Sequence, residues 1–99
     1  MKSIMNTKKG ICYVCGRSCT SQEHHIFYGT ANRNLSEKYG LKVYLCLNHH
    51  TATKEAVHNG NWKLDIRLKQ EAQRAFESQH GSREDFMKIF GKNWLEDEE

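Results

Sequence analysis

The sequence contains no proline, and nowhere does it hold the roughly eighteen consecutive apolar residues that a membrane-spanning helix needs. Residues 1–9 lack the apolar centre of a secretory signal, so we expect a cytoplasmic protein with no membrane partner. The chain also has no internal repeat, low-complexity tract or linker that would separate two domains. Its 99 residues therefore predict one folding unit with a small core.

Charge and composition divide the chain into three expected parts. We expect a flexible basic N-terminus at residues 1–10, a single folded domain at 11–95 and an acidic tail at 96–99. Because 4 of the 12 acidic residues lie in that tail, 15 basic residues stand against 8 acidic ones in the rest of the chain. This positive excess favours a polyanionic partner such as DNA. Apolar residues make up only 37% of the chain, so we expect a thin core that needs additional support.

The pattern of apolar residues predicts an α+β fold. Strands are expected at 23–28, where Gly29 ends the run, and at 41–45. Residues 11–16 resemble a short strand that turns back through a tight turn containing glycine. Helices are expected at 34–39, at 51–57, at 62–79, and from Ser82 to Gly91.

Two pairs of metal-ligating residues are separated by thirty residues: Cys12-x-x-Cys15 and Cys46-x-x-His49. A spacer of two residues lets both side chains of a pair reach one ion, and thiolate and imidazole ligands suit zinc better than magnesium or calcium. The spacing therefore predicts a structural Zn²⁺ site, worth on the order of 10–16 kcal/mol of apparent free energy. Cys19 and His50 are alternatives for one ligand each. We favour His49 because it keeps the two-residue spacing, and we interpret Cys19 as a free thiol.

Four histidines remain outside that site: His24, His25, His50 and His58. Adjacent side chains on a strand point to opposite sides, so His24 and His25 cannot bind one ion equally well. One of them suits a metal, and its neighbour suits a substrate. His50 and His58 are about two helical turns apart and share a face if the helix continues. Each alone would be an ordinary surface or capping histidine, but together, beside a zinc site, they indicate a second site.

The motif order Cys12-x-x-Cys15, His24-His25 and Cys46-x-x-His49-His50 resembles the HNH nucleases of the ββα-metal class, in their zinc-knuckle subgroup. The stretch from His24 to Gly40 is similar to small phage and prophage HNH proteins of the recombination-enhancement, RecA-dependent nuclease type. The resemblance covers about residues 11–59. It implies a zinc-stapled ββα-metal core with C-terminal helices. It also implies an endonuclease that hydrolyses DNA with low sequence specificity, in recombination or DNA processing beside a phage or host recombination protein.

The resemblance also implies a role for each histidine of the second site. His24 is a metal ligand, His25 is the general base that takes a proton from water, and His50 is a further ligand. The family takes another ligand from one helical turn later, a position occupied here by Lys54, so we expect His58 as the substitute. One divalent cation (Mg²⁺, Mn²⁺, Ni²⁺ or Zn²⁺) would stabilise the charge on the leaving oxygen.

The sequence departs from the family at its middle asparagine, which orients the base and falls near Leu41 here. Asn32, Asn34 or a backbone carbonyl are the alternatives for that role. Two other functions stay open: a catalytically inactive, zinc-dependent nucleic-acid-binding module, and a structural adaptor that uses the helix at 62–79. Phosphate contacts are expected from six basic side chains, namely Lys8, Lys9, Arg17, Arg33, Lys42 and Lys54.

Overall fold

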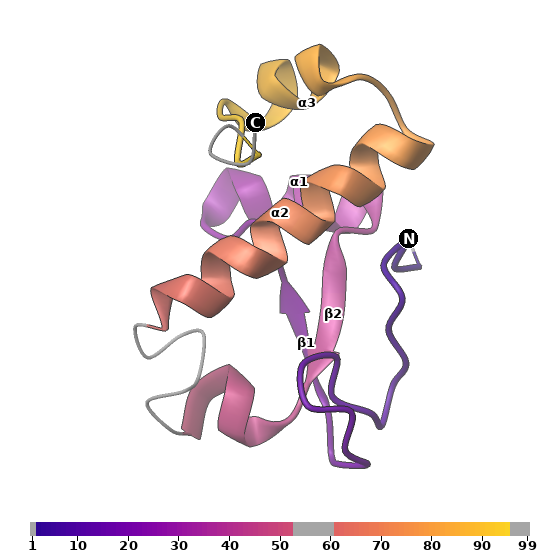
Figure 1. Cartoon of the computed structure of the whole chain (residues 1–99), viewed down its shortest axis with the longest axis vertical. Helices are drawn as coiled ribbons and strands as arrows, with labels where there is room; N and C mark the ends of the chain where they lie inside the picture. The colour runs from indigo at the N-terminus through magenta and orange to yellow at the C-terminus, as the bar shows by residue number, and fades with distance from the viewer. Residues whose placement is uncertain (1, 53–60, 96–99) are drawn as a thin grey trace.

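The computed structural model describes residues 2–52 and 61–95, which form a two-stranded antiparallel sheet with helices packed around it (Figure 1). The elements in chain order are β1 (Gln22–His25), α1 (Thr30–Tyr39), β2 (Lys42–Leu45), the π-helical segment η1 (Asn48–Ala52), α2 (Trp62–Gln79) and α3 (Arg83–Phe90). The predicted α+β class is therefore confirmed.

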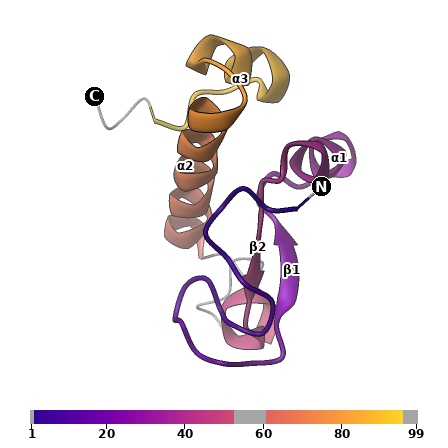
Figure 2. The ribbon, with the colours of Figure 1, turned by 90° about the vertical axis from the view of Figure 1, so that its right-hand side faces the viewer.

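The register of the sheet determines which side chains share a face. His24 pairs with Val43, and His25 pairs with Lys42. Because side chains alternate along a strand, His24 and Val43 point to the buried face, together with Leu45. His25 and Lys42 point to the opposite face. Figure 2 shows α2 lying against one face of the sheet, and its apolar residues complete the core there.

α2 occupies the predicted residues 62–79, because apolar side chains recur along one of its faces at helical spacing. The buried residues of this face are Leu64, Leu68, Ala72, Gln73 and Phe76. At its N-terminus, the Asn61 side chain accepts a hydrogen bond from the backbone N–H of Leu64 at 3.2 Å. Both the periodicity and the cap are local signals, and the prediction for this helix is confirmed.

α3 begins at the predicted Ser82, which forms a capping box with Asp85. The backbone N–H of Asp85 donates to Ser82 Oγ at 3.1 Å, and the backbone N–H of Ser82 donates to Asp85 Oδ2 at 3.0 Å. The helix ends at Gly91, whose φ of 82° is a left-handed conformation that glycine adopts easily. Phe86 is fully buried, and its ring centroid lies 5.5 Å from that of Phe27. α3 is thereby fixed to the core by an aromatic contact.

α1 is longer and β1 is shorter than predicted. α1 begins at Thr30 rather than at residue 34, and β1 ends at His25 rather than at residue 28. The reason is Ser36 on α1, whose hydroxyl accepts a hydrogen bond from the Phe27 N–H at 3.0 Å and donates one to the Phe27 carbonyl at 2.8 Å. Both backbone groups of Phe27 are thus satisfied by a helix instead of a neighbouring strand.

Residues 2–9, which we expected to be a flexible extension, run beside β2 on the side away from β1 (Figure 1). The Ser3 hydroxyl donates to the Lys42 carbonyl at 2.5 Å. The Tyr44 N–H donates to Thr7 Oγ1 at 3.0 Å. These hydrogen bonds occupy backbone groups at the outer edge of β2, an edge that would otherwise be open to pairing with another chain.

Two further predictions differ from the structure. Residues 11–16 form no regular strand; Ile11 makes isolated bridges, and Gly16, at a φ of 73°, turns the chain back. η1 begins at Asn48, before the predicted helix at 51–57. Residues 53–57 of the predicted helix and the predicted acidic tail at 96–99 lie outside the described residues. Among the helices that the structure describes, none has the length and apolar character needed to cross a membrane.

Candidate functional site

The four predicted zinc ligands lie together, with their ligand atoms all within 4.8 Å of one another: Cys12, Cys15, Cys46 and His49. The Sγ atoms of Cys15 and Cys46 are 3.8 Å apart, and Cys46 Sγ lies 3.3 Å from His49 Nδ1. A tetrahedral zinc site with ordinary bond lengths separates two sulfurs by about 3.8 Å and a sulfur from a nitrogen by about 3.5 Å. The group therefore has the size and the donor atoms to bind a metal such as zinc.

Local backbone turns and one contact with β2 assemble this Cys₃His group. The Gly16 N–H donates to the Cys12 carbonyl at 2.9 Å, which closes the first turn. The Tyr13 N–H donates to the Tyr44 carbonyl at 2.7 Å and so joins that turn to β2. β2 leads directly into Cys46, the first ligand of the second pair. Contacts with β2 therefore hold the Cys12/Cys15 pair and the Cys46/His49 pair beside each other.

Two of the thiols differ in acidity. Burial opposes ionisation of Cys12, but backbone hydrogen bonds, first of all at Cys46, outweigh it and lower the pKa of the Cys12 thiol to about 6. Burial raises the pKa of the Cys46 thiol. A metal must therefore displace a proton from Cys46, and metal binding weakens as the pH falls. Cys19, the alternative ligand, does not belong to the group.

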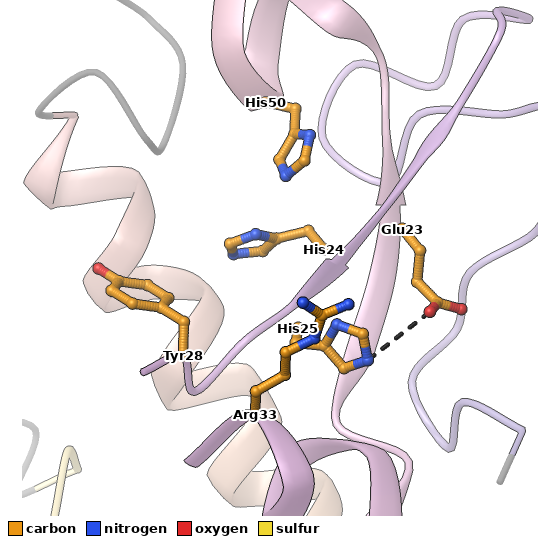
Figure 3. A pocket seen from close by; sticks show the side chains of 6 residues that line it. All are labelled: Glu23, His24, His25, Tyr28, Arg33 and His50. Carbon is orange, nitrogen blue, oxygen red and sulfur yellow. Dashed lines mark ion pairs between the residues drawn. The ribbon is translucent and has the colours of Figure 1, made fainter. Parts of the chain in front are cut away.

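A second set of side chains lines a pocket of about 280 Å³ beside β1 (Figure 3). Its lining residues are Glu23, His24, His25, Tyr28, Arg33 and His50. The structure thus brings together three of the four histidines that the sequence assigns to a second site. The fourth, His58, lies outside the described residues.

His24 and His50 face each other in this pocket (Figure 3). The His24 side chain is 1% exposed, and its ring centroid is 5.3 Å from that of His50. Two imidazoles bound to one tetrahedral ion at ordinary distances would have centroids about 5 Å apart. His50 Nδ1 lies 2.7 Å from Gln22 Oε1, an acceptor, so the proton belongs on Nδ1 and the lone pair on Nε2. This arrangement suits a pair of metal ligands.

α2 supports the wall of the pocket opposite these imidazoles through Tyr28. The Tyr28 hydroxyl donates to Asp65 Oδ2 at 3.1 Å, and Lys69 Nζ lies 4.6 Å from the centroid of the Tyr28 ring. Lys69 also pairs with Asp65 at 2.8 Å. Burial and the negative charge of Asp65 raise the pKa of Tyr28, which therefore stays neutral at physiological pH.

His25 has a different environment from His24. Its Nε2 lies 3.6 Å from Glu23 Oε1 and 3.8 Å from Glu37 Oε1. Lys42 Nζ pairs with the other oxygens of the same carboxylates, at 2.5 Å from Glu37 and 3.3 Å from Glu23. The ligand atoms of Glu23, His25 and Glu37 are close enough for a metal. We assign none there, because the Lys42 ammonium already provides the positive charge.

Glu37 is a functional candidate that the sequence did not identify. Its hydrogen bond with Lys42 lowers the pKa of the carboxyl, which therefore stays ionised beside His25. Leu41, near which the resemblance places an orienting asparagine, is fully buried. Asn32 and Asn34 are exposed, and neither lines the histidine pocket. The only sign of Glu37 in the sequence is its position five residues before Lys42. That spacing brings the two side chains together only because the chain turns between α1 and β2.

The predicted phosphate-binding residues fall in several places. Arg33, from α1, lines the histidine pocket. Three others line a separate cavity beside β2: Lys8, Lys9 and Lys42. Arg17 is exposed next to the first cysteine pair, and Lys54 lies outside the described residues.

Comparison with known protein families, with curated proteins and with solved structures finds no match to this chain. The Cys₃His group offers four protein ligands and suits a closed, structural metal site. The histidine pocket, which is open to solvent and has His24 and His50 facing each other among its described residues, suits an ion that also binds water or substrate.

Proposed function

We propose that the protein is a metal-dependent endonuclease of the HNH type, with a zinc-stapled ββα-metal core, that hydrolyses DNA phosphodiester bonds with low sequence specificity. The observation that carries this proposal is the single pocket shared by His24, His25 and His50, a short distance along the chain from a Cys₃His group. Phosphodiester hydrolysis requires an activated water, charge neutralisation at the phosphoryl oxygens and stabilisation of the leaving oxygen. A cytoplasmic role in phage or prophage recombination, beside a phage or host recombination protein, belongs to the same proposal.

His24 and His50 would hold the catalytic cation, and His58 would add a further ligand. Imidazole donors suit Zn²⁺ and Ni²⁺, while positions left to water and phosphate oxygens also accommodate Mg²⁺ or Mn²⁺. When bound, the cation stabilises negative charge on the leaving oxygen. The proton on Nδ1 of His50, held by Gln22, orients that imidazole toward the pocket.

His25 is the general base of the proposed reaction. The carboxylates of Glu23 and Glu37 lie on the Nε2 side of its ring and favour a proton on that nitrogen. The lone pair then lies on Nδ1, which accepts the proton of the attacking water. Glu23 and Glu37 thereby perform the orienting role that the family gives to an asparagine. His25 Nε2 lies 3.6 Å from Glu23 and 3.8 Å from Glu37. Separations of this length between catalytic groups are common before substrate binds, and a water molecule can bridge them.

Arg33 binds the phosphate in this proposal. Its side chain enters the histidine pocket from α1. A guanidinium offers two parallel N–H donors to phosphate oxygens, and it keeps its charge at every physiological pH. It therefore holds the scissile phosphate beside His25 without contacting a base, in agreement with low sequence specificity.

Nicking of supercoiled plasmid DNA tests the proposal. The wild type, His25→Ala and His80→Ala are each incubated with Mg²⁺, Mn²⁺, Ni²⁺ or Zn²⁺, and DNA binding is measured in parallel. His80 is an exposed histidine at the end of α2 and serves as the matched control. We expect the wild type and His80→Ala to nick, and His25→Ala to bind equally but to nick about a hundredfold more slowly.

Two other outcomes would overturn the nuclease. If the wild type binds DNA but nicks it with none of these metals, the protein is a nucleic-acid-binding module. That result would accord with the lack of an asparagine at or beside Leu41, near which the resemblance places the orienting residue. If it neither binds nor nicks, the structural adaptor is the better account.

A further inference from the structure

A cavity of about 630 Å³ lies between the N-terminal segment and β2. The segment is fixed there, because the Ser3 hydroxyl donates to the Lys42 carbonyl and Thr7 Oγ1 accepts from the Tyr44 N–H. Both hydroxyls are thus engaged with the backbone of the strand. We call this cavity the lysine groove, after the side chains that dominate its lining: Lys2, Lys8, Lys9 and Lys42.

The lysine groove carries uncompensated positive charge. None of the described residues that line it is acidic. Lys42 is neutralised by Glu37 and Glu23, which lie outside the groove. Lys2, Lys8 and Lys9 are exposed, and within residues 2–52 and 61–95 none of them pairs with a carboxylate. Their charge is available to an anionic ligand that occupies the groove.

The sheet connects the lysine groove to the histidine pocket. Lys42, at one end of the groove, is the register partner of His25. The two side chains belong to adjacent strands and point to the same face of the sheet. Lys42 therefore belongs both to the face of the sheet that carries His25 and to the groove that it lines with Lys8 and Lys9. An anion that follows this face passes the two carboxylates held by the Lys42 ammonium before it reaches the uncompensated lysines.

We infer that the lysine groove binds successive phosphates of the nucleic-acid strand next to the cleaved bond. This inference rests on the proposed function for the place of cleavage. A nucleic-acid backbone is a flexible chain of regularly spaced negative charges, which suits a row of separate ammonium groups. Lysine contacts phosphates as a point charge, and the residues that line the groove within the described part of the chain offer no guanidinium or side-chain amide to recognise base edges. The groove therefore fixes the position of the strand without reading its sequence.

The salt dependence of DNA binding tests this inference. The triple variant Lys2→Gln/Lys8→Gln/Lys9→Gln is compared with Lys38→Gln/Lys88→Gln/Lys92→Gln, which removes the same charge from exposed positions on α1, α3 and the chain after α3. Both sets are made in the His25→Ala background, so that the DNA stays intact. Binding of a labelled DNA duplex is followed by fluorescence anisotropy from 50 to 300 mM NaCl, concentrations chosen to span the screening range. Zinc content and thermal melting verify that each variant folds.

We expect the groove variant to lose about tenfold or more in affinity at low salt, and its slope of log K against log salt to become shallower by about 0.9 for each lost phosphate contact. The control variant should keep most of the slope. Equal weakening of both variants, a wild-type slope in the groove variant, or no DNA binding at all would overturn the groove. A protein that binds through these lysines yet never nicks plasmid would instead refute the nuclease and keep the groove.

Discussion

At the residue scale, two adjacent histidines have different chemistry because they point to opposite faces of one strand. His24 is buried and faces the imidazole of His50. His25 faces the carboxylates of Glu23 and Glu37. The first environment suits a ligand that offers its lone pair to an ion. The second suits a base whose proton-bearing nitrogen is held by negative charge.

Glu37→Gln tests the orienting role of this carboxylate. We expect the ¹⁵N NMR signals of His25 to move away from those of the Nε2–H tautomer, because a neutral amide no longer attracts the proton to that nitrogen. Nicking should slow about tenfold, as is usual when a group that orients a functional histidine is lost. Glu84→Gln is the matched control, since Glu84 is exposed and pairs with Lys88 on α3. An unchanged His25 tautomer in Glu37→Gln would contradict the role.

Cys46→Ser tests the metal site. Cys46 provides a ligand sulfur 3.8 Å from that of Cys15 and 3.3 Å from His49 Nδ1. We expect the variant to lose its bound zinc and its cooperative melting, since a structural zinc contributes on the order of 10–16 kcal/mol of apparent free energy. Zinc analysis and calorimetry measure both effects. Cys19→Ser should keep the metal; a Cys46→Ser protein with wild-type zinc and melting would show that the group has no structural role.

The four residues of the Cys₃His group could be predicted from the sequence, whereas Glu37 could not. A two-residue spacer between ligands is a local feature, and two such pairs leave few alternatives. The contact of Glu37 with His25 depends on the length of α1, the turn at Gly40 and the pairing of His25 with Lys42. No single stretch of sequence contains that information.

At the element scale, the predictions succeed where the signals are local. α2 and α3 have their predicted bounds, because periodicity and capping residues are properties of the segments themselves. β1 and α1 differ from prediction because Ser36 binds the backbone of Phe27, nine residues earlier. Ile26, Phe27 and Tyr28 have side chains that favour a strand, but β1 ends at His25 because the contact with Ser36 occupies the backbone of Phe27.

Ser82→Ala tests the cap of α3. The Ser82 hydroxyl accepts a hydrogen bond from the Asp85 N–H at 3.1 Å. We expect the free energy of unfolding to fall by about 1 kcal/mol, as measured by urea denaturation. A change indistinguishable from zero would mean that solvent replaces the cap without cost.

The partner of this cap, Asp85, gives a pH dependence. Hydrogen bonds from Ser82 lower the pKa of the Asp85 carboxyl in the folded protein. Its stabilising contribution is therefore present above the unfolded pKa of about 4 and is lost as the pH falls through the lower folded value. We expect Asp85→Asn to be less stable than the wild type at pH 7, and the two to converge as the pH falls below the lowered pKa of Asp85. A constant difference over that range would exclude the carboxylate as the cause.

At the scale of the whole molecule, two kinds of packing support the two ends of the sheet. The turns that carry the Cys₃His group lie at the end with η1, whereas α3 lies at the other end, and α2 crosses the sheet between them (Figure 1). Aromatic rings fill the α3 end, where the centroid of Phe76 is 5.3 Å from that of Phe86. The histidine pocket draws residues from β1, α1 and η1, so its shape depends on the support at both ends.

The proposed catalytic ion would occupy a site of its own, separate from the Cys₃His group. Anomalous diffraction from crystals of the zinc-loaded protein soaked in Mn²⁺ measures this directly. We expect a zinc peak among the four residues of the Cys₃His group and a separate manganese peak that touches both His24 and His50. Anomalous density at the cysteine site alone, or a second ion that touches neither histidine, would contradict it.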